Sequence, residues 1–302
     1  MIKPSEIKKL YEQGENISAW LRKEMNVAHN TPEIIEISYD IQAGSYIDLL
    51  KDNVIAEQKA KYTQEIAQEI LALCHPESIL EAGVGEATTL SGVLKNIGSD
   101  IKNYGIDISW SRVAYAKKWL KKQNIHNSIL CTGDLFNLPF LDNSVDVVYT
   151  SHSIEPNGGS EKAILRELYR VARKYIVLFE PAYELASDEA RRRMDSHGYC
   201  KNLVNIATSL GYDVIKHDLI TSSGNKLNPT AITIIYKNVD VALPDTPFAC
   251  PKYKSPLKEI DGALYSPEAL IVYPILSEIP CLRIENGIFA SKFEDINTST
   301  IC

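Results

Sequence analysis

The sequence lacks the features of a membrane-inserted or secreted chain. No apolar run in its 302 residues approaches the roughly 20 residues that a membrane-spanning helix needs. Its start, MIKPSEIKKLYEQGENISAW, has no apolar core like that of a signal peptide. We therefore expect a cytoplasmic protein with no membrane contact.

Paired cysteines are also missing. None of the six cysteines forms a C-x-x-C pair: Cys74, Cys131, Cys200, Cys250, Cys281 and Cys302. The usual spacings of zinc sites and redox motifs are therefore absent. We expect no metal, and buried free thiols in a reducing compartment.

Positive charge is in deficit. The chain has 32 Lys and Arg against 39 Asp and Glu, which gives a net charge of −7. Nucleic-acid-binding proteins usually carry a basic surface, because much of their affinity comes from neutralising phosphates. A nucleic-acid partner is disfavoured, although a local basic patch would leave RNA or DNA substrates open.

What the chain does contain is an alternation of short apolar runs and amphipathic stretches. The runs predict strands at 78–84, 103–108, 128–134, 144–153 and 174–183, and two closing strands at 212–220 and 230–237. Helical patterns lie between most of them. Such alternation indicates an α/β fold with a doubly wound, mainly parallel, seven-stranded sheet.

The chain divides into three predicted parts. Residues 1–75 form an N-terminal helical arm or lid, 76–240 the α/β domain, and 241–302 a small C-terminal domain. The segment 238–254 carries three prolines and little periodicity, so we expect a linker there.

Three carboxylates follow three consecutive predicted strands. Glu81 ends the first strand and is followed by Gly83 and Gly85, Asp107 ends the second, and Asp134 follows the third. Ligands of such sheets bind at the carboxyl ends of the strands. The glycines permit a sharp turn and a close approach of the backbone to a ligand. Asp107 suits two ribose hydroxyls, and Asp134 with the next backbone amide suits an adenine edge.

These segments resemble the class I S-adenosylmethionine-dependent methyltransferase family. The stretch 79–90 (ILEAGVGEATTL) is similar to its first motif, 104–109 (YGIDIS) to its acidic loop, and 132–155 to the part that covers adenine and ends the fourth strand. The resemblance spans about 39–182 and implies a Rossmann-like methyltransferase that uses S-adenosyl-L-methionine. It departs at Ala87, where many members have a further glycine.

The resemblance also implies which residues hold the donor. They come from the arm and from the strand tips: Tyr39, Gln42, Tyr46, Glu81, Gly83, Gly85, Thr88, Asp107, Ile108, Asp134, Leu135 and Ser151. The tyrosines of the arm could equally well pack on the sheet without touching a ligand.

Residues after the fourth and fifth strands are candidates for catalysis and acceptor binding. His152 could act as a general base, because the pKa of imidazole lies near neutral pH, or could bond the methionine end of the donor. Glu155 could orient an acceptor amine or hydroxyl, and Asn157, Tyr183 and Arg191 could bind the acceptor. Arginines on a helix are more often a solvated face. Methyl transfer depends mainly on alignment, so a base could be dispensable.

A nicotinamide dinucleotide enzyme is the rival interpretation of the same motifs. Its fingerprint places a pyrophosphate at the helix N-terminus. Glu86 at the helix start and nearby Glu81 would repel a pyrophosphate, whereas S-adenosylmethionine carries cationic groups. The methyl donor is therefore favoured.

The segment 248–282 resembles the small zinc-ribbon family that activates certain tRNA and protein methyltransferases. Of the four cysteines expected there, only Cys250 is present, and Tyr253, Ser266 and Ala269 stand at the other positions. One thiolate cannot form a tetrahedral zinc site. We expect a metal-free ribbon-like domain that packs on the catalytic domain or contributes to a homodimer.

We therefore expect an enzyme that methylates oxygen or nitrogen of a small-molecule biosynthetic intermediate. Two alternatives remain open. The acceptor could be tRNA, rRNA or protein, as the ribbon-like segment hints by analogy, or the chain could be a non-catalytic, donor-binding regulatory or partner subunit.

Overall fold

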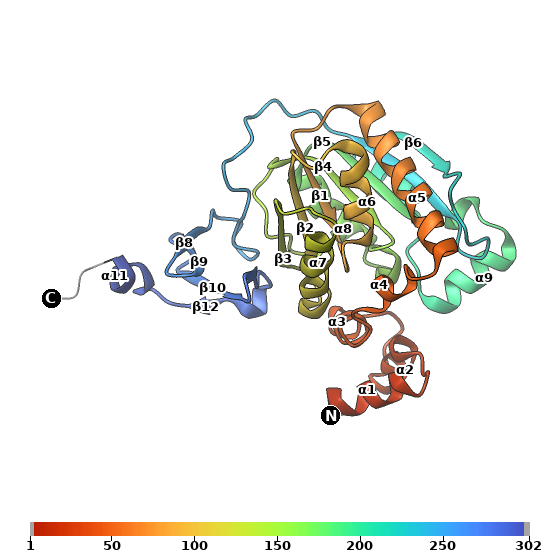
Figure 1. Ribbon diagram of the computed structural model, residues 1–302, viewed down its shortest axis with the longest axis horizontal. Coiled ribbons are helices and arrows are strands. Elements are labelled where there is room, and N and C mark those ends of the chain that lie inside the picture. Colours follow the sequence, from red (N-terminus) through yellow and green to blue (C-terminus); the bar gives the residue numbers. More distant parts are fainter. Residues whose placement is uncertain (1–2, 299–302) are drawn as a thin grey trace.

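A seven-stranded sheet lies at the centre of the computed structural model, which describes residues 3–298 (Figure 1). Its strands are β1 (Ser78–Ala82), β2 (Lys102–Asp107), β3 (Ser128–Thr132), β4 (Val145–Ser151), β5 (Ala172–Pro181), β6 (Asp213–Leu219) and β7 (Thr230–Tyr236). Their order is β3-β2-β1-β4-β5-β7-β6. Strands β1 to β5 are parallel and β7 is antiparallel to both of its neighbours. The predicted fold class is confirmed, and the strand order reverses between β1 and β4, where such sheets bind ligands.

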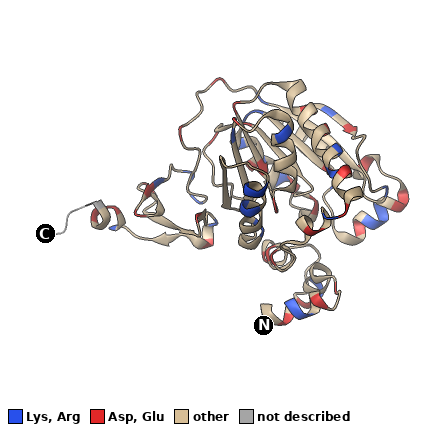
Figure 2. Ribbon diagram, in the orientation of Figure 1, with Lys and Arg blue, Asp and Glu red and all other residues tan. Residues whose placement is uncertain are grey.

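Helices cover both faces of this sheet. One face packs against α5 (Asn53–Leu73), α6 (Thr88–Ile97) and α7 (Trp110–Lys122), and the other against α8 (Glu161–Val171) and α10 (Leu203–Ser209). Alternate residues of a strand point to opposite faces, so neighbours such as Ile79 and Leu80 belong to different clusters. A further helix, α9 (Asp188–His197), follows β5. Helix α9 carries both acidic and basic residues, whereas basic residues gather on α7 (Figure 2).

The N-terminal region is helical, as expected. It contains α1 (Pro4–Glu12), α2 (Ile17–Glu24), α3 (Pro32–Ile41) and α4 (Ser45–Leu49). The first three helices share a small apolar cluster built on Ile7, Ile17, Leu21 and Ile34. Figure 1 shows α3 beside one end of α7, at the edge where the strands end.

The C-terminal region forms a small antiparallel sheet followed by a helix. Its elements are β8 (Lys258–Ile260), β9 (Ala263–Ser266), β10 (Ile271–Leu276), β11 (Ile279–Pro280), β12 (Ile288–Phe289) and α11 (Phe293–Thr298). The chain after β11 pairs with the end of β3: Cys281 bridges Thr132, and the Leu282 N–H donates to the Thr132 carbonyl at 3.1 Å. The open edge of the large sheet is thereby covered at that point.

Side-chain hydrogen bonds involve Cys250, the one expected ribbon cysteine that is present, and Ser266, which stands at one of the other three expected positions. The Cys250 Sγ lies 3.2 Å from the Tyr273 hydroxyl, and the hydroxyls of Ser255 and Ser266 are 2.6 Å apart. Across residues 3–298, no group of three or more His, Cys, Asp or Glu side chains is arranged to hold a metal ion. The relation to zinc ribbons stays a prediction.

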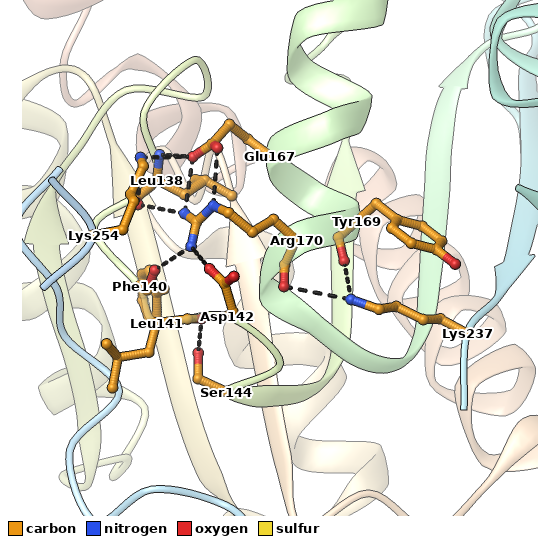
Figure 3. Close-up of polar contacts among 10 residues, drawn as sticks. All are labelled: Leu138, Phe140, Leu141, Asp142, Ser144, Glu167, Tyr169, Arg170, Lys237 and Lys254. Atoms are coloured by element: carbon orange, nitrogen blue, oxygen red, sulfur yellow. Dashed lines mark hydrogen bonds and ion pairs between the residues drawn. The ribbon is translucent and has the colours of Figure 1, made fainter. Parts of the chain in front are cut away.

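The segment between β3 and β4 is fastened by α8 and by the C-terminal region (Figure 3). Arg170 donates to the carbonyls of Leu138 at 2.9 Å and Phe140 at 2.6 Å. Glu167 accepts two bonds from Arg170 and one from Lys254, all at 2.9 Å. The segment 238–254, which we predicted to be a linker, is attached to the same region, because its Ala249 N–H donates to the Pro139 carbonyl.

Two general expectations concern membranes and thiols. Within the described residues, no helix combines the length and apolarity needed to cross a bilayer. Four cysteines are buried free thiols, whereas Cys74 is only half-buried, which corrects the expectation for that residue. Cys302 lies outside the described residues.

Candidate active site

A cavity of about 680 Å³ lies between the ends of β1 to β4 and α3. It gathers most of the predicted donor residues: Tyr39, Tyr46, Gly83, Gly85, Asp107, Ile108, Asp134, Leu135 and Ser151. His152 and Asn157 line it as well. Glu81, Thr88 and Glu155 instead line an adjoining hollow, and Gln42, at the end of α3, lines neither.

The turn after β1 requires glycine at its first position. Gly83 has a φ of +85°, and a Cβ added there would lie 2.1 Å from the Ser153 Cβ. The Gly83 N–H donates to the Ile106 carbonyl at 2.9 Å, which ties the turn to β2. Glycine at this position therefore lets Ser153 pack against the turn, and Gly83 and Gly85 both line the cavity.

Asp107 connects the two strand ends at the centre of the cavity. Its Oδ2 accepts from the Gly85 N–H and its Oδ1 from the Ser109 N–H, both at 2.9 Å. Burial raises the pKa of the carboxyl, although the Arg112 charge and the two N–H groups partly offset that rise. Each carboxylate oxygen can accept a further hydrogen bond, which suits a pair of ribose hydroxyls.

Asp134 stands at the neighbouring strand end. Its Oδ1 accepts from the Phe136 N–H at 2.8 Å. Burial raises the pKa of this carboxyl, and the Phe136 N–H and the Arg283 charge act in the opposite direction. The side chain therefore lines the cavity with acceptor capacity left for a ligand N–H.

Glu86 does not face the cavity. From the sequence we expected its charge to repel a pyrophosphate there, and the structure does not place it to do so. Its carboxylate accepts from the N–H groups of Gly44 at 3.0 Å and Ile47 at 2.8 Å, at the start of α4. An Arg112 Nη1 lies 3.8 Å away. The charge of Glu86 therefore holds the arm against the sheet.

Arg112 is a cavity residue that the sequence analysis missed. Its buried guanidinium lies 4.9 Å from the centre of the Tyr39 ring and 4.3 Å from that of Tyr46. Its Nε donates to the Tyr39 carbonyl at 2.8 Å. Both tyrosines therefore pack on Arg112 and also line the cavity. The sequence did contain a signal for its burial, because Arg112 stands four residues before Ala116 and therefore on the apolar side of α7.

His152 has both ring nitrogens bonded within the chain. Nδ1 bonds the Glu155 carboxylate, and Nε2 lies 2.8 Å from the Thr230 hydroxyl. Burial lowers the pKa of His152, but the bond to Glu155 and the charges of Glu155 and Glu180 outweigh it, so the pKa is raised. In this arrangement neither nitrogen is free to take a proton from an acceptor.

Glu180, at the end of β5, organises the loop that carries His152 and Glu155. It accepts from the N–H groups of Ser153 and Ile154, both at 3.1 Å, and of Glu155 at 3.0 Å. Burial raises the pKa of Glu180 to about 7.

A lysine and a glutamate lie at the border with the adjoining hollow. The Lys59 Nζ donates to the Thr89 hydroxyl at 2.6 Å and lies 5.1 Å from the centre of the Tyr62 ring. Glu81 accepts from the Tyr149 hydroxyl at 3.0 Å. Burial lowers the pKa of Lys59 to about 8 and raises that of Glu81 to about 8, while each charge favours the ionised form of the other. No sequence pattern pointed to Lys59, because its helix, α5, precedes the motifs.

Two predicted acceptor residues lie apart from both cavities. The Tyr183 hydroxyl donates to Asp195 at 3.1 Å, and Arg191 donates to the carbonyls of Tyr183 and Glu184. Their polar groups therefore hold α9 and the turn before it. Asn157 does line the cavity at the strand ends, with its amide donating to the Ser153 carbonyl at 3.0 Å.

Comparisons with known proteins agree with this geometry over part of the chain. Residues 79–175 match a family described as a methyltransferase domain. Demethylmenaquinone methyltransferase of Geobacillus stearothermophilus is 29% identical over 94 residues, which are 31% of this chain and 40% of that protein. Norajmaline N-methyltransferase of Rauvolfia serpentina is 36% identical over 98 residues, 32% of each. The chain thus spans well under half the length of these curated relatives.

A solved structure shares the fold over a longer stretch. Magnesium protoporphyrin IX methyltransferase from Synechocystis PCC 6803, with bound SAH, aligns with a TM-score of 0.51 and 14% identity. The alignment covers 67% of this chain and 99% of that one. The sheet order, the strand-end cavity and these matches together show that the chain contains a class I S-adenosylmethionine-dependent methyltransferase domain.

Proposed function

We propose that the protein is an enzyme that transfers the methyl group of S-adenosylmethionine to a small molecule. One observation carries this proposal: Asp107, Asp134 and the turn at Gly83 converge on one cavity at the strand-order reversal. Ribose, adenine and an aliphatic chain are the three parts of the donor that such a site would bind.

The polar groups present support a definite orientation of the donor. Asp107 would bind the ribose hydroxyls, and Asp134 with the Leu135 N–H the adenine edge. In the adjoining hollow, Lys59 and Glu81 offer one cation and one carboxylate. That pair is complementary to the carboxylate and ammonium of an amino-acid end.

The chain's own contribution to the reaction is alignment. S-adenosylmethionine, when bound, supplies an electrophilic methyl group on a sulfonium. Ser151 and His152 line both the donor cavity and the adjoining hollow, so an acceptor there would meet the donor at the tip of β4. Holding two reactants in line lowers the entropic part of the barrier.

A small acceptor is supported by the shape and charge of the molecule. The net charge is −7, and the hollow is bounded by α5 and the loop between β6 and β7. Two curated relatives are named for methylation of demethylmenaquinone and norajmaline, both small molecules.

Calorimetry with S-adenosylmethionine tests the proposal. We expect binding by the wild type and a weakening of about 10- to 100-fold in Asp107→Ala, because a hydrogen bond to a charged group contributes about 1.5–3 kcal/mol. Asp213→Ala, which removes an exposed carboxylate on β6, is the matched control and should bind like the wild type. Absence of donor binding by the wild type would contradict the proposal.

A further inference from the structure

The hollow next to the donor cavity extends beyond Lys59 and Glu81, the two residues that we assign to the amino-acid end of the donor. It measures about 1330 Å³ and lies between α5 and the loop that joins β6 to β7. Lys59 and Tyr62 line it from α5, and Asn225 and Asn228 from the loop. Because it shares Ser151 and His152 with the donor cavity, its occupant would contact the donor.

The two walls of this hollow are tied together. Glu65 on α5 accepts from the N–H of Thr221 at 2.7 Å and its hydroxyl at 3.0 Å, and from the N–H of Ser222 at 2.8 Å. These bonds lower the pKa of Glu65 against the opposing effect of burial, so it stays ionised at neutral pH. The loop is therefore held in place before any ligand arrives.

A carboxylate, that of Glu155, faces the hollow near the tip of β4, where it is paired with His152. This carboxylate is held by His152 and by the Asn228 amide at 3.1 Å. Burial raises the pKa of Glu155. Its bonds with His152, Tyr199 and Asn228 lower that pKa by more than burial raises it, so the carboxyl group is ionised. The cation of the hollow, Lys59, is engaged with Thr89 and Glu81 at the other wall.

The same end of the hollow has no free base. Both nitrogens of His152 are bonded to Glu155 and Thr230, and the lowered pKa makes Glu155 a weak proton acceptor. A hydroxyl acceptor must lose its proton as it attacks, and this end offers no group to take it. A neutral amine attacks with its own lone pair and needs no base in that step.

We propose that this hollow binds the methyl acceptor, and that the acceptor is a small primary or secondary amine recognised by Glu155. The ammonium form binds and releases one proton to water. The neutral nitrogen then forms the N–C bond while the S–C bond breaks and its electrons stay on sulfur. The product is a methylated ammonium ion, and the donor becomes a neutral thioether. This inference rests on the proposed methyl transfer.

Two pools of probes with matched carbon skeletons test the inference. One holds benzylamine, phenethylamine, tryptamine and their N-methyl derivatives, and the other holds benzyl alcohol, phenethyl alcohol and tryptophol. We expect label from methyl-tritiated S-adenosylmethionine to enter the amine pool. Label only in the alcohol pool, or in neither pool while calorimetry shows donor binding, overturns the inference. Absence of donor binding would instead overturn the proposed function.

A variant pair tests the role of Glu155. Glu155→Gln keeps the shape and removes the charge, so we expect KM for the amine to rise at least tenfold with the donor Kd within twofold of the wild type. Intact donor binding also shows that the variant is folded. Leu227→Ala, on the same loop but outside the hollow, is the control. Equal KM values for Glu155→Gln and Leu227→Ala would overturn the assignment of Glu155.

Discussion

Glu180 shows how one buried residue shapes this site. Its carboxylate accepts three backbone N–H groups from the loop after β4, and burial raises its pKa from 4.5 to about 7. The folded chain therefore keeps a proton that the unfolded chain has already lost between these two pH values. Stability then falls as pH rises through this interval.

A glutamine in place of Glu180 would remove this dependence of stability on pH. We expect wild-type stability to fall relative to Glu180→Gln by about 2 to 3 kcal/mol between pH 4.5 and pH 8, at about 1.4 kcal/mol per pKa unit. Urea unfolding at both pH values measures it. Glu189→Gln, an exposed change on α9, should follow the wild type. If the free energy of unfolding changed equally with pH in the wild type and in Glu180→Gln, the Glu180 carboxyl would not titrate in this range.

Sequence reasoning at the residue scale reached the groups that follow strands. Asp107 and Asp134 were predictable because a strand end fixes where the next side chain lies. Arg112 and Lys59 were not, because their environment comes from tyrosines and carboxyls distant in sequence. The bonds that occupy both nitrogens of His152 depend on Thr230, which lies on another strand.

At the scale of elements, the arm is held on the sheet by charge as well as by apolar contact. Asp40, on α3, accepts from the hydroxyls of Ser109 at 2.8 Å and Ser111 at 2.9 Å, at the start of α7. Arg112, on α7, lies between the tyrosine rings of the arm and 3.8 Å from Glu86. Polar bonds therefore join α3 and α4, the helices that cover the donor cavity and that we call its roof, to α7 and the sheet.

Removing the cation should loosen this roof. In Arg112→Met the Glu86 carboxylate stays buried without its partner, so we expect a loss of about 3 kcal/mol in the free energy of unfolding. Adding Glu86→Gln should recover part of that loss. Denaturant unfolding measures both, with the exposed Arg192→Met as control. If Arg112→Met and Arg192→Met were equally stable, the buried pair would have no structural role.

The elements of the sheet were predictable, and some of their partners were not. Apolar runs predicted all seven strands, because each run is short and bounded by turns or helical patterns. The segment 238–254 was expected to be a linker, yet its Ala249 pairs with Pro139. That pairing joins residues far apart in sequence, and no local pattern encodes it.

At the scale of the whole molecule, three parts of the chain meet beside Asp134 at the edge of the cavity. Arg283, between β11 and β12 of the small sheet, forms an ion pair with Glu36 of α3, and its charge partly offsets the rise in the pKa of Asp134. The Leu282 N–H is bonded to the Thr132 carbonyl at 3.1 Å. The C-terminal region is thus part of the surroundings of the donor cavity.

Reversing the charges should reveal this coupling. We expect Glu36→Arg and Arg283→Glu each to weaken donor binding by about 3- to 10-fold, because a partly exposed ion pair contributes about 1 kcal/mol. The double variant should recover most of the loss. Calorimetry with S-adenosylmethionine measures it, and Lys117→Glu is the control because it breaks another ion pair between α7 and the C-terminal region, with Glu278. No recovery in the double variant would mean that the pair does not act on the donor cavity.

The contact between Thr132 and Leu282 also has a consequence for folding. Contacts between residues so distant in sequence carry a large loop-closure entropy, and they slow folding. A chain whose sheet has formed while its last strands are still unattached would present a bare β3 end to chaperones or to other chains. We therefore expect the capacity to hold the donor to arise as a late event, after the sheet itself has formed.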